Sequence, residues 1–460
     1  MSDREAPRLP DIVIVLADDL GWKDVGFHGA GFPTPNIDRI AAEGVELTRL
    51  YAAPVCSPTR VALLTGRYPI HYGLQRVTIK PWTDLGVPPN EETLAEMLGR
   101  AGYERRGVFG KWHLGDALRF HPLEQGFTEF VGHYGGSIDY FEHTRLGALD
   151  WHHDYSLSRE EGYSTELIGQ HAVRFIRESP ADQPLFLYVP FNAIHGPNHA
   201  TTAYLAASAG IEPENRRIKA AMTASMDDQI GAILGALEAR GTLDDSLLLF
   251  FSDNGGVPPA GSSNEPLRGR KHTVYEGGIR VAAAARWPAG GLAGGRKVDT
   301  PLSVLDIFPT LMGVAGVEAR QDGRLDGEDV IQVLRGDTSG RGDFQFHSYF
   351  NGQTIPGNGA ASDAERRERN AVVTNEWKLV REGPNLDRTE DPRADAKLEL
   401  YRISVDPNEA SDVSASHPDI LAELLERAVR FRQFKPKDAM AIPLSAPEGW
   451  QAPSDWSVQE

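Results

Sequence analysis

The chain has 460 residues, with 47 Lys and Arg against 65 Asp and Glu, and its formal net charge is −18. This length allows a large core and more than one domain, and an apolar share of 40% excludes a largely disordered protein. The acidic balance argues against nucleic acid or an anionic membrane as the main partner, because both are bound through Lys and Arg. The single cysteine, Cys56, excludes an intrachain disulfide and a zinc site built from thiolates.

The N-terminal segment, residues 1–11, is polar and lacks the apolar core of a signal peptide. No run in the chain approaches the ~18 consecutive apolar residues of a membrane span. We therefore expect a cytoplasmic protein with no membrane partner, although removal of a signal segment would leave the same pattern.

Three unbroken apolar runs, at residues 12–17, 185–189 and 247–251, predict strands buried on both faces of a sheet. Helical patterns lie between them. They cover residues 34–44, 58–66, 91–102, 164–178 and 216–241. The alternation predicts an α/β fold with a large mixed sheet flanked by helices on both faces.

After residue 345 the pattern changes, which predicts a large domain at 1–345 and a small α+β domain at 346–460. A segment rich in Gly, Ala and charge predicts a long loop at 351–370. Antiparallel strands are predicted at 371–374, 377–380 and 398–401, one helix at 418–431, and a tail at 435–460 that wraps the surface.

Oxygen-bearing side chains follow two of the predicted buried strands. Asp18 and Asp19 follow the first strand, and Asp253 and Asn254 follow the third. Ligands of such sheets bind at the carboxyl ends of the strands, where convergent oxygens suit a hard divalent cation. The same Asp-Asp pair at residues 227–228 lies inside a predicted helix and indicates only a solvated or structural pair.

Cys56 lies at the start of a predicted helix, because Pro58 has the residue type preferred in a first helical turn. Backbone N–H groups and the helix dipole make this position suitable for an anion or a nucleophile. Arg60, one turn later, is expected to project back toward it. Without this context, a lone cysteine is more often a small buried apolar residue.

The segment CSPTRVALLTGR at 56–67 resembles the first signature of the type I sulfatases, the arylsulfatase family of the alkaline phosphatase superfamily. GKWHLG at 110–115 resembles the second signature. The further matches follow in the order of the family: DDLG at 18–21, NAIHGP at 192–197, SDNGG at 252–256, KHTVYEGG at 271–278, and in the small domain LY at 400–401 and DPNE at 406–409. The resemblance covers nearly the whole chain.

This resemblance implies that a formylglycine-generating enzyme oxidises Cys56 to formylglycine, whose hydrate is a geminal diol. A divalent cation, usually Ca²⁺ in the family, would be held by residue 56 together with Asp18, Asp19, Asp253 and Asn254. Mg²⁺ and Mn²⁺ stay open, because four oxygen ligands do not discriminate sharply between these ions. Residues 1–345 would be the catalytic domain.

The family also implies hydrolysis of a small-molecule sulfate ester through a covalent sulfo-enzyme. Arg60, Lys111 and Lys271 would stabilise the negative charge that develops on the transferring sulfate. His113 would be the base that drives sulfate release, and His195 would donate a proton to the leaving alcohol, together with Lys271. The substrate would be contacted by Lys111, His195 and Lys271, and by Ser137.

Residues 131–155 are rich in histidine and aromatic side chains. No metal-binding spacing within this stretch supports zinc. We interpret it as a loop at the rim of the site whose aromatic residues contact the substrate, with ordinary loop packing as the alternative.

Two other functions remain open. A phosphonate monoester or phosphodiester hydrolase on the same scaffold would also use a formylglycine and a metal, although the Lys111 and His113 pair favours sulfate. A protein with unmodified Cys56 would instead bind sulfated ligands without hydrolysing them. The natural substrate and the oligomeric state do not follow from the sequence.

Overall fold

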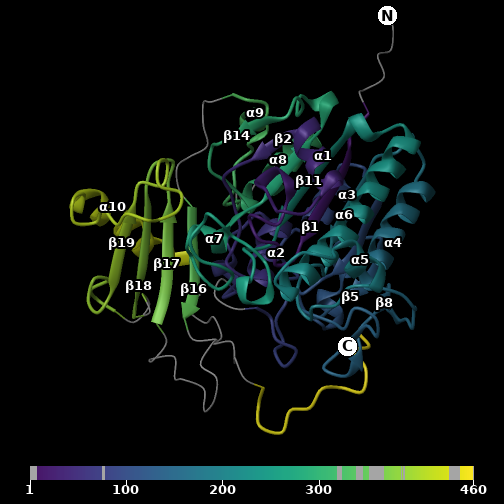
Figure 1. Cartoon of the computed structure of the whole chain (residues 1–460), viewed down its shortest axis with the longest axis horizontal. Coiled ribbons are helices and arrows are strands. Elements are labelled where there is room, and N and C mark those ends of the chain that lie inside the picture. Colours follow the sequence, from purple (N-terminus) through teal and green to yellow (C-terminus); the bar gives the residue numbers. More distant parts are fainter. Residues whose placement is uncertain are drawn as a thin grey trace, which may run out of the picture.

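The computed structural model describes residues 8–74, 78–318, 324–337, 345–351, 367–384, 386, 389–434 and 446–458. For residues 345–351 it describes the backbone alone. Figure 1 shows a large α/β body beside a smaller lobe built from a separate sheet. The α/β architecture with a mixed sheet is therefore confirmed.

The large sheet has ten strands in the order β14-β2-β13-β11-β1-β10-β4-β5-β8-β9. Their bounds are β1 Asp11–Ala17, β2 Val45–Leu47, β4 Arg105–Lys111, β5 Glu129–His133, β8 His152–His153, β9 Ser156–Leu157, β10 Leu185–Pro190, β11 Ser246–Ser252, β13 Ala283–Arg286 and β14 Arg296–Val298. The central strands β11, β1, β10, β4 and β5 are parallel, and β13 and β8 join them antiparallel. Every residue of β1, β10 and β11 is buried, as the unbroken apolar runs predicted.

Helices cover both faces of this sheet. Alternate residues of β1 separate two cores: Ile12 and Ile14 belong to one, and Val13 and Val15 to the other. The first core receives α2 Cys56–Thr65, α3 Leu94–Arg100 and α8 Ile307–Val314, and the second receives α1 Pro35–Glu43, α4 Ser164–Glu178 and α6 Glu214–Arg240. Short helices α5 Thr202–Ala207, α7 Glu276–Ile279 and α9 Ile331–Leu334 complete the set, with short strands β3 Leu50–Tyr51, β6 Thr144–Arg145, β7 Ala148–Leu149, β12 Arg280–Val281 and β15 Leu302–Ser303.

Two helices begin at other residues than the sequence predicted. The helix expected at 91–102 begins only at Leu94, because Thr93 and Glu96 form a reciprocal capping box. The helix expected from residue 58 begins at Cys56, so Pro58 lies in its first turn as the third residue.

The small lobe is a four-stranded antiparallel sheet in the order β16-β17-β18-β19. Its elements are β16 Gln345–Asn351, β17 Arg367–Val373, β18 Lys378–Pro384, β19 Lys397–Tyr401 and helix α10 Pro418–Phe431. The loop expected at 351–370 is wrong at both ends, where β16 and β17 pair instead, and residues 352–366 lie outside the described part. The domain boundary at 345 and 346 stays a prediction.

The C-terminal segment 446–458, yellow in Figure 1, runs along the bottom of the view and ends beside the large body. Trp456 is buried there: its backbone N–H donates to Leu149 O at 3.0 Å, and its indole Nε1 donates to Arg145 O at 2.9 Å. The Arg145 guanidinium lies 3.9 Å from the Trp456 ring centroid. Part of 446–458 thus packs against the large body, whereas 435–445 lie outside the described residues, and the wrapping tail at 435–460 stays a prediction.

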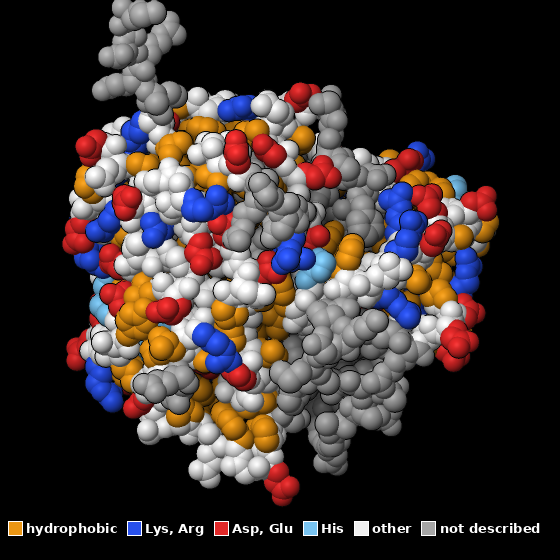
Figure 2. Space-filling view, turned by 180° about the vertical axis from the view of Figure 1, so that it is seen from behind, with side chains coloured by type: hydrophobic (Ala, Val, Ile, Leu, Met, Phe, Trp, Pro, Cys, Tyr) orange, Lys and Arg blue, Asp and Glu red, His pale blue; other side chains and the backbone are white. Residues whose placement is uncertain are grey.

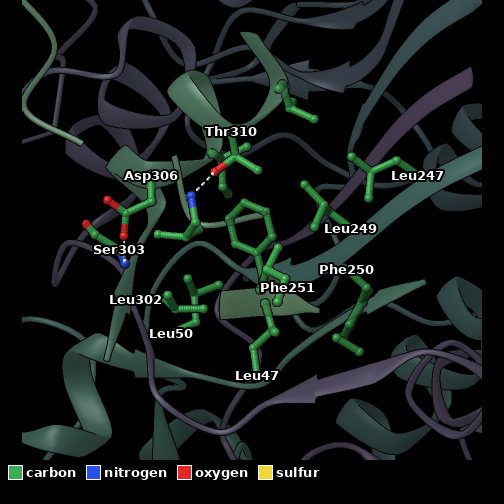
Figure 3. A pocket seen from close by; sticks show the side chains of 15 residues that line it. Leu47, Leu50, Leu247, Leu249, Phe250, Phe251, Leu302, Ser303, Asp306 and Thr310 are labelled. Carbon is green, nitrogen blue, oxygen red and sulfur yellow. Dashed lines mark hydrogen bonds between the residues drawn. The ribbon is translucent and has the colours of Figure 1, made fainter. Parts of the chain in front are cut away.

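A small cavity of about 30 Å³ lies between β11 and α8, lined mainly by leucine and phenylalanine side chains (Figure 3). Its polar members are already hydrogen-bonded, since Thr310 Oγ1 accepts from Val330 N at 3.0 Å and Asp306 Oδ2 accepts from Ser303 N at 2.7 Å. None of the predicted catalytic residues lines it. We interpret this cavity as a packing feature.

Acidic and basic side chains are interspersed over the face shown in Figure 2, so the charge of −18 does not form a continuous acidic surface there. In the described part of the chain, every helix is too short or too polar to cross a bilayer.

Candidate active site

The two oxygen-rich strand ends lie together because β1 and β11 are parallel neighbours in register. Ala17 is paired with Ser252, so the next residues of both strands leave the sheet at the same edge. Asp19 N donates to Asp253 Oδ1 at 3.3 Å, and Asn254 Nδ2 donates to Asp19 Oδ1 at 2.8 Å. Both aspartates and Asn254 are buried, and the site therefore lies where sheet topology places ligands.

Cys56 is the first residue of α2, and its thiol faces this group. Its Sγ lies 3.7 Å from Asp18 Oδ1 and 3.4 Å from Lys271 Nζ. Burial, with Asp253 nearby, raises the pKa of the Cys56 thiol to about 12. An unmodified thiol here is protonated at neutral pH and is a poor nucleophile.

Three buried cations surround the carboxylates. Arg60 Nη2 lies 2.8 Å from Asp253 Oδ2, Lys271 Nζ lies 2.6 Å from Asp19 Oδ1, and Lys111 forms an ion pair with Asp18. Arg60 also donates to the carbonyl of Lys111 at 2.8 Å, which joins α2 to the end of β4. The concentrated positive charge that an anionic substrate requires is therefore present within an acidic protein.

His113 has a left-handed backbone conformation and is hydrogen-bonded to the first turn of α2. Its φ is 57°, in the left-handed region, and its backbone carbonyl accepts from Ser57 Oγ at 3.1 Å. Burial, with Lys111 and Arg60 nearby, lowers the pKa of His113 well below its ordinary value. Its Nε2 contacts Ile79 O at 3.3 Å, whereas Nδ1 is buried without a partner. A neutral imidazole with a free nitrogen can accept a proton.

His195 differs from the predicted proton donor in its protonation state. Nδ1 contacts Gly196 O at 2.7 Å, which places the ring proton on Nδ1, and Nε2 lies 3.6 Å from Asp19 Oδ2. Burial, together with the charges of Lys271 and Lys111 and against the opposing effect of Asp19, lowers the pKa of His195 to about 3. A donor role therefore requires that bound substrate raise this pKa.

A divalent cation fits the donor set of this site. Ligand atoms of Asp18, Asp19, Cys56 and His195 all lie within 4.8 Å of one another. Among the described residues, Asn254 Oδ1 is buried and has no hydrogen-bond partner, although the amide on the same side chain has two. A buried oxygen without a partner is costly, and a cation would satisfy it.

The rim interpretation of residues 131–155 is wrong for most of its aromatic side chains. Tyr134, Tyr140 and Trp151 are buried in the core, whereas Phe141 and Tyr155 are exposed, at 44% and 45%. Tyr140 OH donates to the carbonyls of Asn192 and His195, at 2.7 and 2.8 Å. Packing, the alternative interpretation, explains these buried rings, and Tyr140 also supports the loop that carries His195.

Ser137 is half-buried beside the site. It follows Gly136, where a Cβ atom would come within 2.7 Å of the His113 ring. Its proposed contact with sulfate stays a prediction.

Sequence reasoning missed two residues that fix the site. Thr59 Oγ1 donates to Asp253 O at 2.6 Å, which ties α2 to the end of β11. Asp150 accepts from the backbone N–H groups of Tyr134 and Gly135, at 3.0 and 2.9 Å, and so holds the turn that leads to Gly136. Thr59 lies inside the recognised signature, but no local pattern marks Asp150.

A sequence model of the Sulfatase family matches residues 10–317. The chain belongs to the sulfatase family. Mouse Arylsulfatase J is 33% identical over 94% of this chain and 78% of its own length, and human N-acetylgalactosamine-6-sulfatase is 34% identical over 83% and 76%. This sulfatase is accordingly a sulfuric ester hydrolase, and sulfate esters are its substrates.

Solved structures confirm the fold over both lobes. Ps i-CgsB in complex with k-i-k-neocarrahexaose superposes with a TM-score of 0.82 at 28% identity, covering 94% of each chain. Phosphonate Monoester Hydrolase of Agrobacterium radiobacter superposes with a TM-score of 0.65 at 21% identity, which shows a shared fold alone. The sulfate ester hydrolase is thus better supported than the phosphonate alternative. The cytoplasmic location stays a prediction.

Buried neutral histidines predict that this sulfatase loses stability in acid. Burial lowers the pKa of His133 to about 3, and both ring nitrogens lack partners. Below pH ~6.5 His133 binds a proton in the unfolded chain but stays neutral in the folded protein. Through this residue, the free energy of unfolding therefore falls by about 2 kcal/mol between pH 7.5 and pH 5. Urea unfolding of the native chain and of His133→Leu at both pH values measures the difference. An equal loss in both proteins would contradict the assignment.

Proposed function

We propose that this sulfatase hydrolyses sulfate esters through a formylglycine formed from Cys56. The observation that carries the proposal is the position of Cys56, with Sγ 3.7 Å from Asp18 Oδ1 and 3.4 Å from Lys271 Nζ. The only cysteine in the chain therefore lies among oxygen ligands and cations. Its conversion from CH₂SH to CHO is an oxidation, for which a formylglycine-generating enzyme and an external oxidant are needed.

The hydrated aldehyde supplies two hydroxyl groups on one carbon. One hydroxyl oxygen forms a bond to sulfur while the bond from sulfur to the alcohol oxygen breaks, which leaves a covalent sulfo-enzyme. The second hydroxyl then loses its proton and forms the carbonyl double bond. The bond from carbon to the sulfate oxygen breaks, sulfate leaves, and water hydrates the aldehyde again. A serine or cysteine side chain has no second hydroxyl with which to expel sulfate.

A divalent cation, most simply Ca²⁺, would be held by Asp18, Asp19, Asp253, Asn254 and residue 56, and when bound it would lower the pKa of the attacking hydroxyl. Arg60, Lys111 and Lys271 lie around the same point. Because they are buried, their charges act with little screening on the sulfate oxygens as negative charge develops there.

Proton transfers are assigned to the two histidines. His113 would take the proton from the second hydroxyl, consistent with its lowered pKa and free Nδ1. His195 would protonate the leaving alcohol once the negative substrate has raised its pKa, and Lys271 stabilises the same oxygen. In this proposal Lys111, His195, Lys271 and Ser137 contact the substrate.

Mass spectrometry of the peptide that contains Cys56 tests the proposal directly. Conversion to formylglycine lowers the peptide mass by about 18 Da, because CH₂SH is replaced by CHO. The protein should be produced in cells that contain a formylglycine-generating enzyme, and its turnover of an aryl sulfate should scale with the converted fraction. Turnover by fully unconverted protein would contradict the proposal.

Removal of the metal is expected to abolish turnover. A chelator should reduce aryl sulfate hydrolysis to background, and added Ca²⁺ should restore it, with Mg²⁺ and Mn²⁺ tested alongside. Asp253→Asn should lower metal affinity by at least about tenfold, since it removes a charged oxygen ligand. Asp228→Asn, on the exposed part of α6, is the matched control. Full activity after exhaustive chelation would contradict the metal assignment.

A further inference from the structure

A second group of ligand-type side chains lies outside the active site. His153, Glu160 and His171 bring two imidazole nitrogens and a carboxylate oxygen within 4.8 Å of one another. His153 ends β8, His171 lies in α4, and Glu160 lies in the segment between β9 and α4. Three separate parts of the chain therefore meet at one point, and none of these residues belongs to the active site proposed above.

Both imidazoles present Nε2 to the same carboxylate. His153 Nε2 lies 3.0 Å from Glu160 Oε2, and His171 Nε2 lies 2.9 and 3.0 Å from Oε1 and Oε2. The two rings are perpendicular, with centroids 5.0 Å apart. Ligand atoms around a tetrahedral zinc lie about 3.3 Å from one another, so this spacing needs only a small adjustment.

Neighbouring side chains fix the group. Trp151 Nε1 donates to Glu160 Oε2 at 3.0 Å, which orients the carboxylate, and Phe109 stacks on the His171 ring with an angle of 15° between the planes. The His171 side chain is 12% exposed, whereas that of His153 is 42% exposed. One side is therefore anchored in the protein, and the other is open to a water ligand.

We propose that His153, Glu160 and His171 bind a zinc ion that joins the β8–β9 hairpin to α4. Two imidazoles and one carboxylate are the donors of a zinc site, whereas Ca²⁺ requires oxygens almost exclusively. Zinc would bind Nε2 of each neutral imidazole, whose proton then lies on Nδ1, and Trp151 would hold the carboxylate in place. The sequence hid this site, because His171 lies outside the histidine-rich stretch and Glu160 is seven residues from His153.

Zinc content of the full-length protein tests the proposal. The protein is dialysed against Zn²⁺ with excess Ca²⁺ to occupy the active site, and bound zinc is counted by elemental mass spectrometry. We expect one zinc per chain, loss of that zinc in His171→Ala and Glu160→Gln, and its retention in His71→Ala. His71 is a matched control, because it also contacts a carboxylate, Asp326, at 3.0 Å, and in the described part of the chain no second histidine contacts that carboxylate.

Two further measurements separate this site from the active site and from misfolding. Co²⁺ in place of zinc should give visible absorption of a tetrahedral complex in the native chain, weakened in the half-exposed variant His153→Ala. Zn²⁺ should raise the unfolding temperature of the native chain and of His71→Ala but not of His153→Ala. If zinc stays bound in all three site variants, it binds elsewhere in the protein. If the native chain binds no zinc, the three residues form only a hydrogen-bonded His-Glu-His group. Either result overturns the proposal.

Discussion

Cys56→Ala is expected to lower turnover of an aryl sulfate by roughly 10⁴-fold or more, because it removes the precursor of the nucleophile. The small apolar replacement leaves the surrounding ion pairs in place. Circular dichroism should therefore show an intact fold, and steady-state hydrolysis measures the loss. Activity within tenfold of the native enzyme would sink the nucleophile assignment.

Cys56→Ser separates attack from release. A serine oxygen in the same place can attack sulfur but cannot expel sulfate, since it has no second hydroxyl. We expect at most one alcohol released per chain, followed by no turnover, with a mass increase of about 80 Da on the peptide that holds Ser in place of Cys56. Continuous turnover by this variant would contradict the elimination step.

Lys378→Met is expected to destabilise the protein by about 3–5 kcal/mol, because it leaves two buried carboxylates without their common partner. Lys378 Nζ in β18 lies 2.9 Å from Glu276 Oε1 in α7 and 2.9 Å from Glu409 Oε1. All three residues are buried, and burial already raises the pKa of Glu409 to about 7. This cluster fixes the small sheet to the segment that follows Lys271.

Urea unfolding followed by tryptophan fluorescence measures this effect. Lys297→Met is the matched control, because Lys297 Nζ also lies 2.9 Å from a carboxylate, that of Glu46, but its side chain is 65% exposed. The control should cost less than about 1 kcal/mol. Adding Glu409→Gln to Lys378→Met should restore part of the loss, since one buried charge is removed. Equal costs for Lys378→Met and Lys297→Met would contradict the account.

The sequence predicted the central strands of the sheet because the apolar pattern of each strand matches its burial in the tertiary structure. Fully apolar runs mark strands that are buried on both faces, and β1, β10 and β11 confirm this. The convergence of Asp18, Asp19, Asp253 and Asn254 was also predictable, because residues at the carboxyl ends of neighbouring parallel strands must emerge at one edge. Helix boundaries were less certain, since a side-chain cap such as Thr93 decides them.

Protonation states could not be predicted from the sequence. His195 is neutral because burial and the charges of Lys271 and Lys111 outweigh its contact with Asp19, and all of these reach it from other elements. The aromatic stretch at 131–155 has the composition of a binding rim, yet Tyr134, Tyr140 and Trp151 fill the core. Composition does not show which side of a loop meets the protein.

By itself, the sequence determined which reactive side chains this protein carries and where they lie along the chain. They are a cysteine at a helix start, carboxylate and amide side chains at two strand ends, and basic residues in signatures of fixed order. Each of these is a short-range feature that backbone geometry carries into place. Only the tertiary structure decided which distant charges share a buried point, as for Lys378 between Glu276 and Glu409 and for Glu160 between His153 and His171. Such contacts depend on packing between elements far apart in the chain, and no local pattern encodes that packing.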